Sequence, residues 1–101
     1  MLHIVNKSPM ERNALETCLR VIPDGAILLI EDAVYAATKG NAAATKLRDA
    51  MSANAQLKVY VLAPDVEARG MQDRVMEGVT TVDYGGFVDL VAEHKNCQSW
   101  L

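Results

Sequence analysis

The chain has 101 residues, half of them hydrophobic and 23% of them charged, with a formal net charge of −3. This composition is typical of one globular domain and excludes a disordered chain, while the scattered Lys and Arg argue against a nucleic-acid-binding surface. The longest apolar run, residues 26–30, is too short to cross a bilayer, and the N-terminus lacks the features of a signal peptide. We therefore expect residues 1–101 to form a single cytoplasmic domain.

The first part of the chain is predicted to form a strand, a helix and a second strand. Residues 2–5 are a short apolar run, and a Ser-Pro pair with a following Glu marks the start of a helix over residues 8–22. Residues 26–30 form a continuous apolar run between turn signals, which is typical of a strand buried on both faces. After this strand, Asp32 is expected to cap a short helix over residues 33–39.

The second part of the chain continues the alternation of helices and strands. The predicted elements are a helix over residues 41–51, a strand over 57–62, a brief helix over 64–70, a strand over 79–82 and a last helix. The tail over residues 98–101 is expected either to add a short edge strand or to dock by its tryptophan. The last helix has a one-sided stripe that comprises Phe87, Leu90, Val91 and His94. This pattern indicates βαβ units, so we expect a three-layer α/β/α domain with a mostly parallel sheet of four to five strands.

The ends of the predicted strands hold the first candidate site residues, because ligands of open α/β sheets gather there. No glycine-rich nucleotide motif and no nucleophile elbow follows any of these strands. The Glu31-Asp32 pair could hold a metal or act as acid and base, but a helix cap is the commoner role of such an Asp. His3 and His94 are isolated, and no His-Cys cluster has the spacing of a metal site. The sequence therefore predicts neither a cofactor nor a metal.

Two cysteines are the candidate nucleophiles. Cys18 lies among apolar neighbours on its predicted helix, which favours a buried and unreactive thiol. Cys97 lies in a polar stretch next to Lys95 and Asn96, which favours a more accessible thiol, yet no C-x-x-C motif accompanies it. Neither cysteine defines an active site by its local sequence alone.

Several segments of the chain, taken in order, resemble the TusB/DsrH family. These segments are Leu-His-Ile-Val-Asn-Lys-Ser-Pro at 2–9, Ile-Glu-Asp-Ala-Val-Tyr-Ala-Ala at 30–37, Lys-Val-Tyr-Val-Leu at 58–62, Pro-Asp-Val-Glu-Ala-Arg-Gly at 64–70, Val-Asp-Tyr at 82–84 with Phe-Val-Asp-Leu at 87–90, and Trp100. The resemblance implies a DsrEFH-like fold and a small subunit of a heterohexameric sulfurtransferase complex. It implies DsrE/TusD-like and DsrF/TusC-like partner subunits, and a DsrC/TusE-like carrier protein that receives persulfide sulfur.

The resemblance also bears on the pathway and on the role of the chain. Residues 6–19 are closer to DsrH, in which a cysteine matches Cys18, so we expect dissimilatory sulfur oxidation with an auxiliary sulfur-handling role for Cys18. One alternative is a TusB-type subunit in 2-thiolation of the tRNA wobble uridine; another is a purely structural subunit with no sulfur-carrying cysteine. We expect no catalysis by the chain alone and no direct contact with nucleic acid or membrane. Whether the chain forms a homo-oligomer without its partners is left open.

Overall fold

The computed structural model describes residues 2–6, 25–40, 42–54, 56–94 and 97–100. The described elements, in chain order, are β1 (Leu2–Val5), β2 (Gly25–Leu29), the 3₁₀ helix η1 (Glu31–Ala37), α2 (Ala42–Ala53), β3 (Leu57–Leu62), α3 (Ala63–Ala68), β4 (Val79–Val82), α4 (Tyr84–Glu93) and β5 (Cys97–Trp100). The helix predicted over residues 8–22 lies outside the described residues, and so does Cys18.

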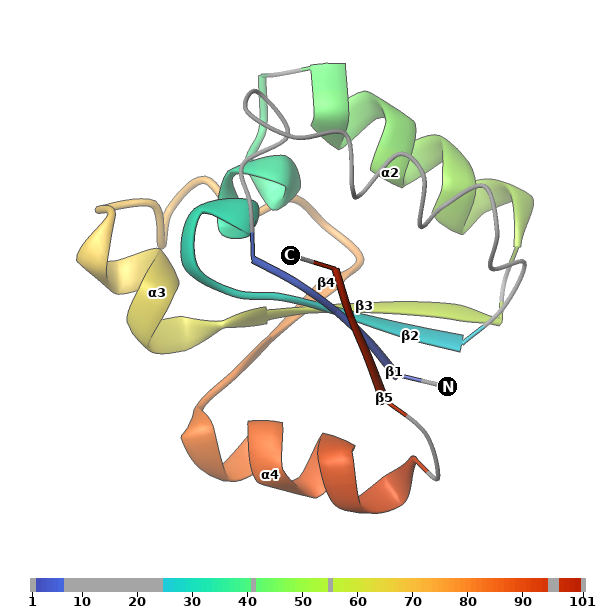
Figure 1. The fold of residues 1–101 in the computed structure, drawn as a ribbon. Helices are drawn as coiled ribbons and strands as arrows, with labels where there is room; N and C mark the ends of the chain where they lie inside the picture. The colour runs from blue at the N-terminus through green and yellow to red at the C-terminus, as the bar shows by residue number, and fades with distance from the viewer. Residues whose placement is uncertain (1, 7–24, 41, 55, 95–96, 101) are drawn as a thin grey trace.

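The strands form one five-stranded sheet in the order β4-β3-β2-β1-β5 (Figure 1). Every neighbouring pair of strands is parallel. The chain adds β2, β3 and β4 in succession on one side of β1, and after α4 it adds β5 on the other side, where Cys97 pairs with Leu2. The mostly parallel sheet of four to five strands and the C-terminal edge strand are thus confirmed.

Strand β2 explains why the sequence has a continuous apolar run instead of an alternating pattern. Its side chains point in turn to the two faces of the sheet. Ile27 and Leu29 lie in the larger hydrophobic cluster, whereas Ala26 and Leu28 lie in the smaller one on the opposite face. All four are at most 2% exposed. Burying each Leu side chain stabilises the fold by about 2 kcal/mol.

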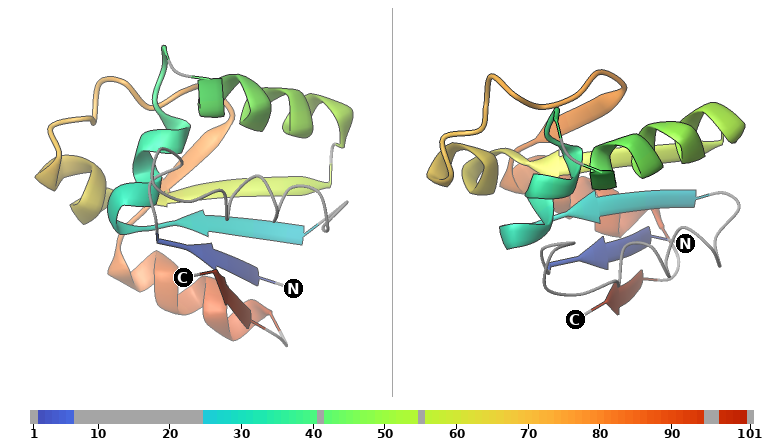
Figure 2. Two further views of the ribbon diagram at one scale, coloured as in Figure 1. Left: turned by 45° about the horizontal axis from the view of Figure 1, so that its top comes forward. Right: turned by 90° about the horizontal axis from the view of Figure 1, so that it is seen from above.

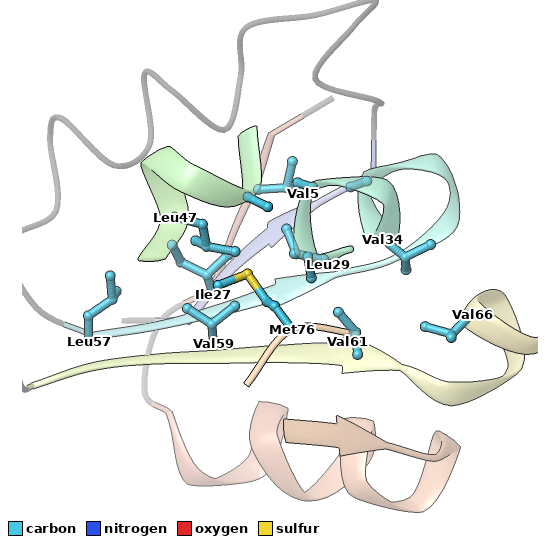
Figure 3. Packing of buried hydrophobic residues seen from close by; sticks show 14 residues of the cluster. Val5, Ile27, Leu29, Val34, Leu47, Leu57, Val59, Val61, Val66 and Met76 are labelled. Carbon is cyan, nitrogen blue, oxygen red and sulfur yellow. The ribbon is translucent and has the colours of Figure 1, made fainter. Parts of the chain in front are cut away.

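Helices η1, α2 and α3 cover the face of the sheet that carries the larger cluster (Figure 3). In α2, Ala44, Leu47 and Met51 recur at helical spacing and turn toward the sheet, with Leu47 fully buried. The segment before β4 closes over the same cluster, because Met76 N–H donates to the carbonyl of Ala37 at 2.8 Å. This face therefore holds most of the apolar packing of the described residues.

Helix α4 packs on the opposite face of the sheet, so the chain forms the predicted three layers (Figures 1 and 2). Leu90 is buried in the smaller cluster, and Phe87 packs against it. Asp83 caps the helix, since its Oδ1 accepts a hydrogen bond from Gly86 N–H at 2.8 Å. Val91, which belongs to the stripe that the sequence predicted for this helix, is 39% exposed.

None of the described helices combines the length and the apolar character that a membrane-crossing helix requires.

Candidate functional site

The carboxyl ends of β1, β2 and β3 lie next to one another, because these three parallel strands are neighbours in the sheet. The residues that follow them include Asn6, Glu31, Asp32 and Asp65. This edge is where ligands of open α/β sheets gather, and the sequence predicted candidate residues here. The structure does bring together the polar residues that follow β2 and β3.

Arg69 joins the two short helices that follow these strands, η1 and α3. It caps the C-terminus of α3, and its Nε and Nη2 donate to Oδ1 of Asp32 at 3.1 and 2.8 Å. Its Nη1 also donates to the carbonyl of Asp65 at 3.1 Å. The Arg69 side chain is 22% exposed and the Asp32 side chain 49% exposed, so the ion pair is only partly shielded from water.

Asp32 does not cap the following helix, which corrects the prediction from sequence. The helix η1 begins at Glu31, two residues before the predicted start at residue 33, with Ile30 in the capping position and no side-chain cap. Asp32 therefore lies inside the first turn, where its carboxylate is directed to Arg69 instead of to the helix N–H groups.

Glu31 adopts a backbone conformation that residues with a side chain rarely take. Its φ is 50°, in the left-handed region, which costs about 1 kcal/mol for a residue other than glycine. Its N–H donates to Oδ2 of Asp65 at 2.7 Å, and this charge-assisted bond holds the bend after β2. We call Glu31, Asp32, Asp65 and Arg69 the carboxyl-edge clasp.

The clasp joins η1 to α3 and leaves little room for acid–base chemistry. Both Asp carboxylates already accept hydrogen bonds, one from Arg69 and the other from the Glu31 backbone. Beside the clasp, Asn6 has a buried Oδ1 with no hydrogen-bond partner among the described residues. Within the described residues, no group of three or more His, Cys, Asp or Glu is placed to hold a metal ion. The arrangement is that of a structural clasp.

The two histidines lie apart from the clasp, in the elements that the sequence predicted. His3 lies in β1 and is 3% exposed. Burial, followed by the positive charge of the amino terminus, lowers the pKa of His3 below its ordinary value of 6.5. His94 is the C-cap of α4, with its Nδ1 2.8 Å from the carbonyl oxygen of Leu90.

Neither cysteine is placed at the clasp by the described part of the chain. Cys18 lies outside it. Cys97 begins β5 and is paired with Leu2 at the start of β1, so its backbone lies at the amino edge of the sheet. The clasp and Cys97 are therefore at opposite edges of the sheet.

The role of Arg69 is the feature that sequence reasoning missed. Its ionic partner is 37 residues away, and the bond from Glu31 to Asp65 spans 34 residues. No local pattern encodes such contacts. The available signal was topological: two neighbouring parallel strands, each followed by an aspartate, place those aspartates at one edge.

Comparisons with known proteins agree with this fold. The family model described as "DsrH like protein" matches residues 7–97. "Protein TusB" of Pectobacterium parmentieri is 37% identical over 101 residues, covering 99% of this chain and all of the relative. "Protein TusB" of Escherichia coli O81 (strain ED1a) is 36% identical with the same coverage.

A solved structure extends the agreement to the backbone. The crystal structure of the ychN protein from E. coli has a TM-score of 0.80 and covers 97% of each chain at 18% identity, which supports the fold alone. The family model and the TusB proteins cover nearly all of the sequence at substantial identity. The chain therefore belongs to the TusB/DsrH family.

Proposed function

We propose that this chain is the TusB-type subunit of a cytoplasmic sulfur-relay complex that serves 2-thiolation of the wobble uridine in tRNA. The observation that carries the proposal is the similarity to TusB proteins, at 35–37% identity over 99% of the chain. The clasp supports a subunit role over a stand-alone enzyme, since its Asp carboxylates are engaged in joining η1 to α3. In this proposal, residues 1–101 act as one unit.

The tRNA branch is preferred here to sulfur oxidation, which reverses the order suggested by the sequence. That order depended on residues 6–19 and on Cys18, nearly all of which lie outside the described residues. The relatives compared above are named TusB, which favours the tRNA branch. Sulfur oxidation is the second candidate, and the DsrH-like description of the family model supports it.

The proposed complex transfers sulfur by thiol–persulfide exchange. A thiolate on the acceptor attacks the outer sulfur of a donor persulfide. A new S–S bond forms between the acceptor and that sulfur, and the S–S bond of the donor persulfide breaks. The donor leaves as a thiolate and takes up the proton that the acceptor thiol lost, so no external oxidant or reductant is consumed. In the proposal, the principal cysteine belongs to the DsrE/TusD-like partner, a DsrF/TusC-like subunit completes the heterohexamer, and a DsrC/TusE-like carrier receives the sulfur.

Cys18 is proposed to assist this exchange in an auxiliary role. Replacing it with serine should reduce the rate of sulfur delivery by the assembled complex while leaving assembly intact. Cys97→Ser is the matched control, because the Cys97 backbone begins an edge strand at the amino edge. Equal delivery by wild type and Cys18→Ser would show that the chain is a structural subunit without a sulfur-carrying cysteine.

The pathway is tested by measuring 2-thiouridine in tRNA. In cells that lack the gene, the modified nucleoside should fall sharply and return when the full chain is supplied. Thiolation that persists in the deletion strain, together with loss of sulfur oxidation, would assign the chain to the other branch.

A further inference from the structure

We draw no further inference here: the strongest candidate, the surface patch on α4 where the side chains of Tyr84, Val88 and Val91 are exposed, carries none, because nothing in the structure shows what covers it.

Discussion

At the scale of single residues, the most connected side chain at the carboxyl edge is that of Arg69. Its guanidinium donates to the carboxylate of Asp32, after β2, and to the backbone carbonyl of Asp65, after β3. The carboxylate of Asp65 in turn accepts a hydrogen bond from the N–H of Glu31. Helices η1 and α3 are thus joined by hydrogen bonds donated from each side. The free energy of unfolding should therefore depend on the geometry of these groups as well as on their charge.

Asp65 should be the most sensitive member of the clasp. Asp65→Ala removes the acceptor of the Glu31 N–H, which lies in a left-handed bend, and should lower the free energy of unfolding by about 1–2 kcal/mol. Asp65→Asn keeps an oxygen acceptor at the same place and should cost less. Urea denaturation of both variants measures the difference, and equal losses would contradict the role given to this hydrogen bond.

The ion pair between Arg69 and Asp32 should contribute modestly. Arg69→Lys retains the positive charge but loses the paired donors, and should cost about 1 kcal/mol because the site is partly exposed. A double-mutant cycle with Asp32→Asn isolates the interaction between the two side chains. A coupling energy near zero would indicate that the contact of Arg69 with the Asp65 carbonyl is sufficient to hold the end of α3 in place.

His3 makes stability depend on pH in a defined direction. Its pKa is lowered in the folded chain, so the unfolded chain takes up a proton first as the pH falls below the ordinary value of 6.5. The free energy of unfolding should therefore decrease from that pH down to the folded pKa and show no further loss from this group below it. Urea denaturation across this range should give a smaller pH dependence for His3→Leu than for wild type, while His94→Gln serves as control. An unchanged slope in His3→Leu would contradict the assignment.

At the scale of elements, the sequence predicted the strands better than the helix boundaries. The segments that became β1, β3 and β4 have the predicted bounds, because each concentrates residues that favour strands, such as Val, Ile and Thr. The start of η1 was missed by two residues, since the conformation of Glu31 depends on Asp65, which is distant in sequence. The exposure of the Val91 side chain was not predicted either, because an apolar residue on a helix does not reveal whether the rest of the chain covers it.

The first turn of α4 permits a matched test of its packing on β4. A Cβ at Gly86 would lie 2.9 Å from the Cβ of Val82, whereas a Cβ at Gly85 would meet only the Asp83 carboxylate, at 3.3 Å. Alanine favours a helix over glycine by about 1 kcal/mol, so Gly85→Ala should be neutral or slightly stabilising. Gly86→Ala should be destabilising by about 1–3 kcal/mol, because α4 must shift from β4. Thermal unfolding measures the stability of both variants, and a Gly86→Ala variant as stable as the wild type would contradict this packing.

At the scale of the whole molecule, the alternation of strands and helices predicted the parallel three-layer fold. The order of strands was not predictable in the same way, because the position of β5 beside β1 depends on contacts between the two ends of the chain. The candidate site divides similarly. The edge of the sheet and the Glu31-Asp32 pair followed from topology, whereas Arg69 as the partner of Asp32 emerged only from the contact between η1 and α3.

The central claim is that this chain is a subunit of a sulfur-relay complex, and native mass spectrometry after co-expression with DsrE/TusD-like and DsrF/TusC-like subunits tests it most directly. The account predicts one assembly that contains all three chains, and, after incubation with a persulfide donor, a reducible gain of sulfur on the DsrE/TusD-like subunit. Assembly of the two partners into a complete, sulfur-accepting complex from which this chain is absent would contradict it.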